Sequence, residues 1–279
     1  MKAISGLATL LLFFMVNGFA ADAVPDESPV TLITFGIVPQ QSATKLARLW
    51  APILGYISKE AGLTVVFRTA RDIPTFEQRL RNGEYDLAYM NPYHYTVFHE
   101  DPGYQAFAKA RDKKIKGILV SSKDGDINKI SQLEGSTLAF PAPASFAASI
   151  LTRAYLQKQG VSFTPRYVSS HDSVYRTVAA GLYPAGGGVI RTLRNMDVSI
   201  WEKLKILWES PGYTPHAFAA HPGLAPAKLG MIQKAMIEME HTEAGQKLLK
   251  SIQLKGIEAA GDSDWDDVRA LDIRQLFEK

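Results

Sequence analysis

Polar side chains that can bind an anion follow several of the expected β-strands of this chain. Ser145 stands directly before one expected helix, and His171 stands at the start of the next. Beyond the carboxyl end of a strand, the free N–H groups and the positive dipole of a following helix attract anions. A hydroxyl or an imidazole N–H at that place can donate a further hydrogen bond. These two positions predict an oxyanion-binding site.

Three further residues belong to the candidate site. Arg191 follows Gly186–Gly188 and can bind an oxyanion through two parallel hydrogen bonds. Tyr93 lies in an aromatic cluster after an expected strand. His216 lies between two expected strands, where we expect the chain to cross between two lobes.

Each candidate also has a structural alternative. Ser145 and Ser170 are of the type that caps helix N-termini. His171 would then be a surface histidine in a first helical turn, and Arg191 a solvated arginine. At least one residue of the aromatic cluster Tyr93–Tyr95 is expected in the core, because adjacent residues point in different directions.

The sequence argues against catalysis. The absence of cysteine excludes thiol nucleophiles, thiolate metal sites and disulfide scaffolds. The chain has no GxSxG or HExxH motif, and no nucleophile–base pair is evident. Gly186–Gly188 lacks the pattern of a nucleotide-binding loop, so a close approach of the backbone to a ligand or to another strand explains it better. Asp262–Asp267 lacks the glycine and terminal glutamate of a calcium loop and is expected at a helix N-terminus. We expect neither an enzyme nor a bound metal or cofactor.

Composition sets the class of protein. The chain has 279 residues, 46% of them hydrophobic, which is enough for one large or two medium domains with a proper core. Its 31 basic and 28 acidic residues give a net charge of +3, which is too balanced to indicate a nucleic-acid partner.

Strands alternate with helices in two successive series. The expected strands are 31–38, 63–67, 86–90, 104–110, 116–121, 137–140, 165–168, 204–208 and 217–220. The expected helices are 41–62, 72–80, 145–159, 170–181, 225–240, 242–252 and 263–277, with a short helical piece after the triple glycine. This alternation predicts α/β sheets rich in parallel strands, and the two series predict two lobes.

The N-terminal segment is expected to direct export. Lys2 is followed by the apolar run Leu7–Val16 and by small residues suited to a cleavage site. The alternative, a membrane anchor, would need roughly 20 apolar residues, and the run is shorter. We therefore expect residues 1–20 to be a signal peptide, cut after Ala20 or Ala23, and the mature protein to be periplasmic.

The order and spacing of several short motifs resemble one protein family. The matching stretches are Phe35–Pro39, Asp86–Tyr89 with Asn91-Pro92, Leu133–Gly135 before Thr137–Phe140, Pro143–Ala147, Ser170–Asp172 with Ala179–Gly181, and Ser210-Pro211 before Pro215. Together they resemble periplasmic solute-binding proteins of the phosphate/phosphite/phosphonate ABC-transporter type (PhnD-like). The resemblance extends over nearly all of the chain after the signal segment.

The resemblance implies a type II periplasmic-binding-protein fold. This is an α/β architecture of two lobes, each a mostly parallel sheet flanked by helices, that close on a ligand. We expect lobe 1 to comprise residues 30–115 and 214–279, and lobe 2 to comprise residues 116–213. The family's phosphonate group sits on the helix start that matches Ala144, Ser145 and Phe146, beside a histidine that matches His171.

The sequence departs from the family pattern at two places. The Ser/Thr-rich phosphate turn of the family is reduced here to Ser145. Family members that bind aminophosphonates use carboxylates for the ligand amine, whereas Arg191 and His216-Ala217 stand near those positions here. We therefore expect an amine-free oxyanion as ligand.

The leading hypothesis is the periplasmic solute-binding component of an ABC transporter. It would act as a monomer, capture a phosphonate-, phosphite- or phosphate-like anion in the cleft between the lobes, and deliver it to a membrane permease without chemical change. Two alternatives remain open: a ligand-binding sensory module for a membrane histidine kinase, and an exported enzyme on the same fold.

Overall fold

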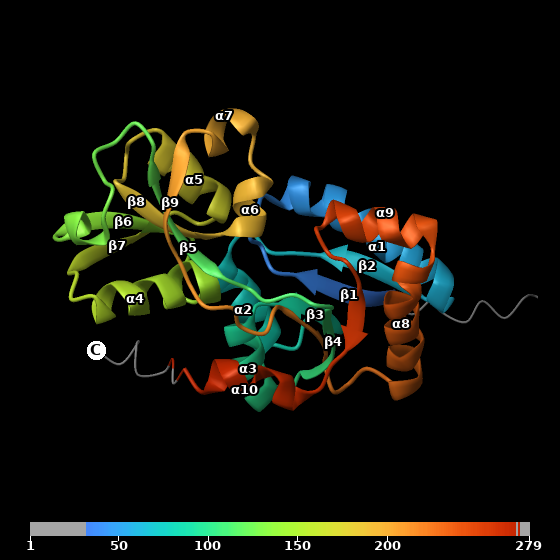
Figure 1. Ribbon diagram of the computed structural model, residues 1–279. Helices are drawn as coiled ribbons and strands as arrows, with labels where there is room; N and C mark the ends of the chain where they lie inside the picture. The colour runs from blue at the N-terminus through green and yellow to red at the C-terminus, as the bar shows by residue number, and fades with distance from the viewer. Residues whose placement is uncertain (1–31, 272, 274–279) are drawn as a thin grey trace, which may run out of the picture. The chain divides into compact units, whose positions relative to one another are not determined.

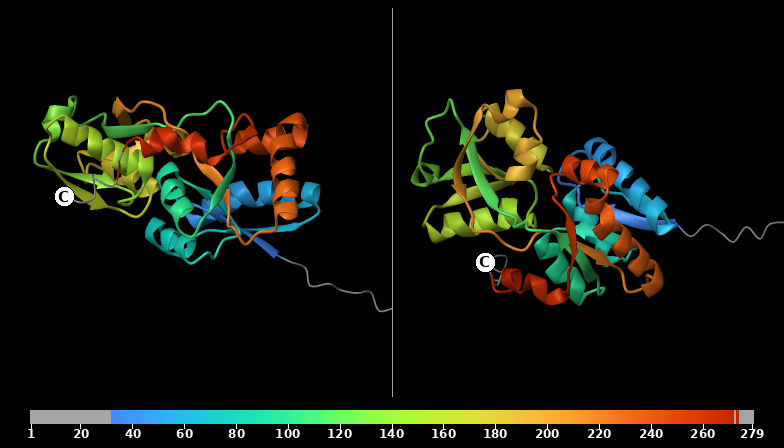
Figure 2. Two further views of the ribbon diagram at one scale, coloured as in Figure 1. Left: turned by 90° about the horizontal axis from the view of Figure 1, so that it is seen from below. Right: turned by 45° about the vertical axis from the view of Figure 1, so that its right-hand side comes forward.

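The computed structural model describes residues 32–271 and 273, which belong to one compact unit. The predicted signal peptide and the end of the last predicted helix lie outside these residues. Within the described part of the chain, the strands form a six-stranded and a five-stranded sheet. Figure 1 shows the two sheets with their helices, and the turned views of Figure 2 keep the two groups of elements apart. We call the six-stranded sheet with its helices lobe 1, and the five-stranded one lobe 2.

Lobe 1 has the strand order β11-β4-β10-β3-β1-β2. Its strands are β1 (Leu32–Ile37), β2 (Thr64–Arg68), β3 (Leu87–Met90), β4 (Gln105–Ala110), β10 (Ala217–Ala220) and β11 (Ile257–Ala259). Its helices are α1 (Ala43–Ala61), α2 (Ile73–Arg81), α3 (Pro92–Glu100), α8 (Pro226–Glu238), α9 (Glu243–Ser251) and α10 (Asp266–Arg269), with 3₁₀ turns at Met239–His241 and Asp262–Trp265. Helix α1 packs on β2 and against α8 and α9.

Lobe 2 has the strand order β7-β6-β8-β5-β9. Its strands are β5 (Gly117–Ser122), β6 (Ser136–Phe140), β7 (Phe163–Tyr167), β8 (Ala185–Val189) and β9 (Leu204–Glu209). Its helices are the π-helix η2 (Phe146–Leu151), which continues as α4 (Thr152–Lys158), then α5 (His171–Ala179), α6 (Ile190–Arg194) and α7 (Val198–Trp201), with a 3₁₀ turn at Ile130–Leu133.

Each sheet combines parallel and antiparallel pairs. The first strands of each series are parallel: β1 pairs with β2 and β3, and β6 pairs with β7 and β8. Strands β10 and β5, which adjoin the passages between the sheets, pair in the antiparallel direction. The predicted two-lobed α/β fold is confirmed, and both sheets are mixed because the chain passes between them twice.

The two passages between the lobes are bonded to each other. Ile115 N donates to Tyr213 O at 2.8 Å, and Tyr213 N donates to Ile115 O at 3.0 Å. Two residues after Ile115, Gly117 N donates to the hydroxyl of Ser210 at 2.9 Å. The two segments that connect the lobes therefore form a short antiparallel β-bridge.

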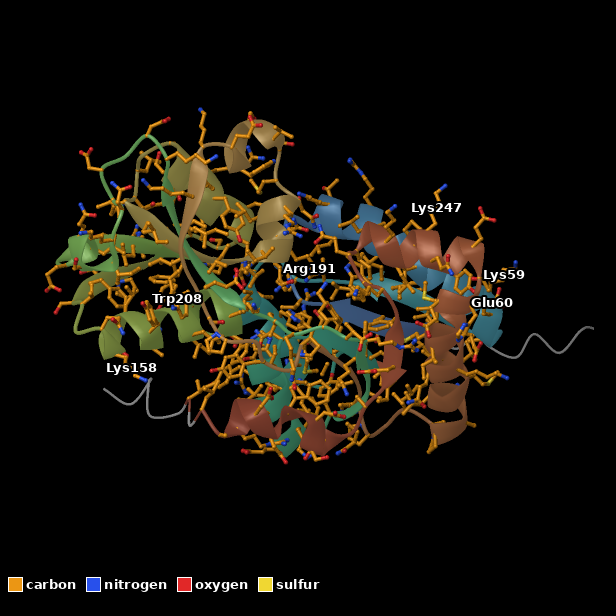
Figure 3. The ribbon with its side chains drawn as sticks, viewed as in Figure 1. Lys59, Glu60, Lys158, Arg191, Trp208 and Lys247 are labelled. Carbon is orange, nitrogen blue, oxygen red and sulfur yellow. The ribbon has the colours of Figure 1, made fainter. Side chains whose placement is uncertain are left out.

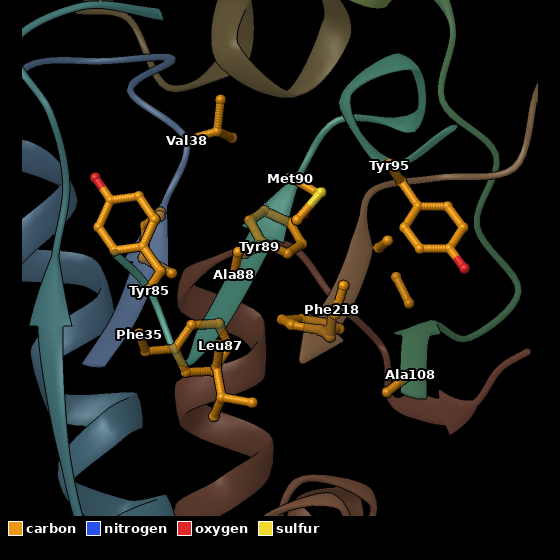
Figure 4. Packing of buried hydrophobic residues seen from close by; sticks show 14 of the residues in the cluster. Phe35, Val38, Tyr85, Leu87, Ala88, Tyr89, Met90, Tyr95, Ala108 and Phe218 are labelled. Atoms are coloured by element: carbon orange, nitrogen blue, oxygen red, sulfur yellow. The ribbon is translucent and has the colours of Figure 1, made fainter. Parts of the chain in front are cut away.

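The core of lobe 1 contains a cluster of aromatic side chains. Figure 4 shows Tyr89 of β3 close to Phe218 of β10, with Tyr85 and Phe35 nearby. The ring centroids of Tyr89 and Phe218 are 4.7 Å apart, and Trp50 of α1 lies 4.8 Å from Tyr89. In lobe 2, Ile118 and Val120 of β5 join a different apolar cluster from Leu119, as expected for alternate residues on the two faces of a strand.

Several elements differ from the sequence prediction, among them the last predicted helix, where a 3₁₀ turn precedes α10 and α10 ends at Arg269. Asn91-Pro92 ends β3 as expected but also begins α3, because the Asn91 side chain accepts from His94 N at 2.8 Å and proline suits a first helical turn. His94 and Tyr95 are fully buried there, which confirms core packing within the aromatic cluster. The triple glycine lies inside β8, and β11 was not predicted because it is only three residues long.

The glycines of β8 permit close packing inside lobe 2. A Cβ atom on Gly187 would collide with the Ala148 carbonyl of η2 and lie 2.9 Å from the Phe140 ring. A Cβ atom on Gly186 would lie 2.5 Å from a methyl group of Val174. The close approach anticipated for these glycines is thus to neighbouring helices and to β6, and it lets η2 lie directly on the sheet.

We predict that Gly187→Ala destabilises the protein, because the backbone of η2 cannot yield as a flexible side chain would. The expected loss in free energy of unfolding is roughly 1–3 kcal/mol or more, measured by urea denaturation. Gly55→Ala is the matched control, since Gly55 is an exposed position of α1 with open space around it, and it should stabilise by up to about 1 kcal/mol. Equal midpoints for the two variants would contradict this packing argument.

Candidate anion-binding site

The buried side chain of Gln40 contacts residues of both lobes. It follows β1, and its Nε2 lies 3.0 Å from Nε2 of His216 in lobe 1. Its Oε1 accepts from the Arg191 guanidinium of lobe 2 at 2.5 Å, and its backbone carbonyl accepts from His171 N at 3.2 Å. Gln40 therefore contacts three residues that the sequence marked as candidates. We call Gln40, Arg191, His171 and His216 the Gln40 cluster.

His171 is an interior residue. It begins α5, where Ser170 caps the helix by accepting from Ser173 N at 3.1 Å, as predicted for Ser170. His171 is 1% exposed, and its Nε2 and Nδ1 each lie 3.3 Å from a hydroxyl, those of Ser145 and Thr192 respectively. The alternative of a surface histidine is therefore wrong.

Both buried histidines of the cluster are neutral at physiological pH. Burial, reinforced by the Arg191 guanidinium, lowers the pKa of His171 to about 3. The same two causes hold the pKa of His216 well below its ordinary value. Each imidazole therefore presents one N–H donor and one lone pair. Arg191 supplies the permanent positive charge of the cluster.

Ser145 ends the loop after β6 and precedes the π-helix. Its hydroxyl makes no capping bond, and its carbonyl accepts from Ser149 N at 2.8 Å and Ile150 N at 3.1 Å. The capping alternative for Ser145 is therefore wrong, and the hydroxyl faces His171 instead. π-Helical turns are often found at functional sites.

The neighbours of Ser145 contribute backbone and packing. The Ala144 carbonyl accepts from the Asn91 side chain of lobe 1 at 3.1 Å, which joins the loop to the other lobe. The Phe146 ring is 1% exposed and meets Tyr213 edge-on at 5.7 Å between centroids. The Phe146 side chain therefore packs in the interior, and only its backbone could serve a ligand.

Beside the Gln40 cluster lies a cavity of about 500 Å³. Its wall comes from both lobes and from the segment between β4 and β5, with Arg191 and His216 on its surface. Figure 3 labels Arg191 near the middle of the view, between the strands of the two lobes. The full lining is Tyr89, Ala110, Lys113, Lys114, Ile115, Lys116, Val189, Ile190, Arg191, Arg194, Pro215, His216 and Gln253.

Tyr93 lies apart from this group. It lines a separate depression with residues of α3 and with Val268 and Arg269 of α10. The aromatic residue at the cavity is Tyr89, whose ring stacks on His216 at 4.9 Å between centroids. The Arg191 guanidinium lies 6.0 Å from the centroid of the same ring, a cation–π distance.

The sequence did not predict a place in the site for Gln40, Tyr89, Thr192 or Lys113, and the basic stretch Lys113–Lys116 was expected to be a solvated loop. Gln40 stands in a strand-end loop, which was the one available signal for it. Thr192 and Tyr89 resemble ordinary core residues, and only the three-dimensional structure shows their contacts with the histidines.

Within residues 32–271 and 273, no three His, Asp or Glu side chains are close enough together to hold a metal ion. In the same part of the chain, no helix combines the length and hydropathy needed for a membrane span.

Comparisons with known proteins agree with this architecture. A family model described as "ABC transporter, phosphonate, periplasmic substrate-binding protein" matches residues 35–265. The phosphate-import protein PhnD of Mycolicibacterium smegmatis is 22% identical over 278 residues, with 85% of this chain and 84% of that protein covered.

Two solved structures share the fold. A binding protein component of an ABC phosphonate transporter from Pseudomonas aeruginosa matches with a TM-score of 0.80 and 18% identity, over 86% of this chain and 85% of that one. PhnD1 from Prochlorococcus marinus in complex with methylphosphonate matches with a TM-score of 0.81 and 16% identity, over 89% and 99%.

The two neutral histidines predict a pH-dependent stability. In the unfolded chain a histidine has a pKa near about 6.5, whereas the pKa of folded His171 is about 3 and that of His216 is also lowered. Their contribution to the free energy of unfolding is complete above pH about 6.5. It is lost as the pH falls from there toward 3, because the unfolded chain binds the extra protons.

Urea titrations between pH about 7 and about 5 test this effect. His171→Asn should lose less stability over that interval than the unmodified protein does. The control is His241→Asn, at an exposed position outside the cluster, which should retain the full dependence. The same pH dependence in all three proteins would refute the burial of a neutral His171.

Proposed function

This chain belongs to the family of periplasmic substrate-binding proteins of phosphonate ABC transporters, and we propose that it captures a phosphonate, phosphite or phosphate between its lobes and delivers it to a membrane permease. The observation that carries this proposal is the Gln40 cluster. It brings neutral donors and one cation from both lobes to a single buried place. Its composition suits an oxyanion, which needs hydrogen-bond donors and positive charge.

The anion would bind at the start of η2. The backbone N–H groups there, the Ser145 hydroxyl and the His171 imidazole are donors already fixed by folding. Arg191 would supply the balancing charge from the start of α6. Fixed donors in a site that excludes water bind an anion strongly, because little reorganisation is needed when the anion arrives.

The two lobes would move about the paired passages between them. We place the boundaries after residues 115 and 213, where Ile115 and Tyr213 exchange two backbone hydrogen bonds. Small changes of φ and ψ in such segments suffice for domain closure. Gln40 would then favour the closed arrangement, since its partners come from both lobes.

We propose binding without catalysis, as a monomer. Ser145 and His171 do lie 3.3 Å apart, a nucleophile–base contact that the sequence did not predict. However, a histidine with a pKa of about 3 is a poor base, and its other nitrogen faces the hydroxyl of Thr192 instead of an orienting carboxylate. The same pair is well suited to donate hydrogen bonds to a bound oxyanion.

Removal of either donor should weaken binding without unfolding the protein. For Ser145→Ala and His171→Ala we expect the affinity for methylphosphonate, measured by calorimetry, to fall about tenfold to a hundredfold, as for loss of a hydrogen bond to a charged ligand. Ser251→Ala, at an exposed position of α9, is the matched serine control and should bind like the unmodified protein.

Unchanged affinity in both donor variants would disprove the assigned site. Failure of the unmodified protein to bind methylphosphonate, phosphite and phosphate would disprove the proposed function itself. Hydrolysis of a phosphate ester, abolished in His171→Ala, would support the enzyme alternative instead.

A further inference from the structure

The cavity beside the Gln40 cluster is strongly basic. Its wall includes the side chains of Lys113, Lys114, Lys116, Arg191 and Arg194, and none of the described residues that line it is acidic. The basic residues lie on two segments, the passage from β4 to β5 and helix α6. A cavity with one sign of charge concentrates ligands of the opposite sign.

Three of these five cations have no carboxylate partner within residues 32–271 and 273. Lys114 and Lys116 form ion pairs outside the lining, with Asp267 at 3.5 Å and Glu209 at 2.6 Å. Among the residues the structure describes, no Asp or Glu forms an ion pair with the side chains of Lys113, Arg191 or Arg194. Lys113 Nζ donates to the Gln253 carbonyl at 2.6 Å, and Arg191 donates to Gln40.

This arrangement is electrostatically unfavourable without a ligand. Burial, with the nearby Arg191 guanidinium as the second cause, lowers the pKa of Lys113 to about 8. An anion that enters the cavity offsets the repulsion among these cations and so stabilises the protein. One oxyanion at Ser145 and His171 would balance Arg191 but leave Lys113 and Arg194 without an anion, because neither Ser145 nor His171 lines the cavity.

The size of the cavity also calls for more than a bare oxyanion. Its volume of about 500 Å³ lies within the usual range for organic ligands, about 300–1,000 Å³. Between the basic residues lie apolar groups suited to a short carbon chain. These are Tyr89, Ala110, Ile115, Val189, Ile190 and Pro215.

We propose that the ligand is an organic phosphonate whose far end carries a carboxylate, which binds in the basic cavity against Lys113 and Arg194. This inference rests on the proposed function, which places the phosphonate at Ser145 and His171. Arg191 joins the two subsites, because it lines the cavity and also bonds Gln40, whose carbonyl accepts from His171 N. The carbon chain between the two anionic groups would contact the apolar wall.

Three ligands with the same number of carbon atoms and different terminal charge test the proposal by calorimetry. They are 3-phosphonopropionate, propylphosphonate and 3-aminopropylphosphonate, at an ionic strength of about 0.15 M so that distant charges are screened. We expect the carboxylate ligand to bind at least tenfold more tightly than the methyl-terminated ligand, and the amine-terminated ligand to bind most weakly.

Two variants locate the effect. Lys113→Gln and Arg194→Gln should each reduce the ratio between the first two affinities to about threefold or less, since each removes a cation from the cavity. Arg194 is exposed, so its variant should fold even if Lys113→Gln does not. Lys247→Gln removes an exposed lysine of α9, labelled in Figure 3, and should keep the full ratio.

The possible outcomes distinguish failure of this inference from failure of the proposed function. Equal affinities for the carboxylate and methyl-terminated ligands would overturn the second anionic subsite but would not contradict the proposed phosphonate site. A preference that survives in both cavity variants would also overturn it. If none of the three ligands binds, and simple phosphonate, phosphite and phosphate do not bind either, the proposed function fails first.

Discussion

The hydrogen bonds of one glutamine hold the site together. A primary amide can donate and accept at the same time, and Gln40 uses both ends of its side chain as well as its carbonyl. Its partners are a neutral histidine of its own lobe and two residues of the other lobe. An acid at this position could not donate to His216, and a lysine could not accept from Arg191. The amide is thus well matched to a junction between an arginine and two neutral imidazoles.

Packing inside lobe 2 determines where the donors stand. The small residues of β8 allow η2 to lie directly on the sheet, and this places Ser145 at the helix start beside His171. Helix α5 also packs on β8, where Tyr175 donates to the Val189 carbonyl at 3.0 Å. This bond fixes α5 against the start of α6. The glycines therefore act on the site indirectly, through the helices that they bring close to the strand.

The sequence predicted most of the fold because its signals are local. Alternating apolar strands, cap residues such as Asp72, Ser170 and Thr242, and stop signals such as Gly62 operate within a few residues. The strand β8 was not recognised, since glycine has low strand propensity and its value here depends on distant neighbours. The short β11 gave no periodic signal at all.

The site was only partly predictable, for a similar reason. Ser145 and His171 could be found because they mark strand ends and helix starts, which are local features. Gln40 and Lys113 depend on contacts between segments more than a hundred residues apart, such as Lys113 with Gln253. Tyr93 was selected as an aromatic residue after a strand, but it lines another depression, while Tyr89 four residues earlier lines the cavity.

The central claim is that an oxyanion draws the two lobes together around Gln40 and its partners. Small-angle X-ray scattering of the ligand-stripped protein, before and after saturation with the tightest-binding phosphonate, tests it most directly. The account predicts a smaller radius of gyration in the saturated protein. A radius that stays the same while calorimetry records binding would contradict closure of the lobes on the ligand.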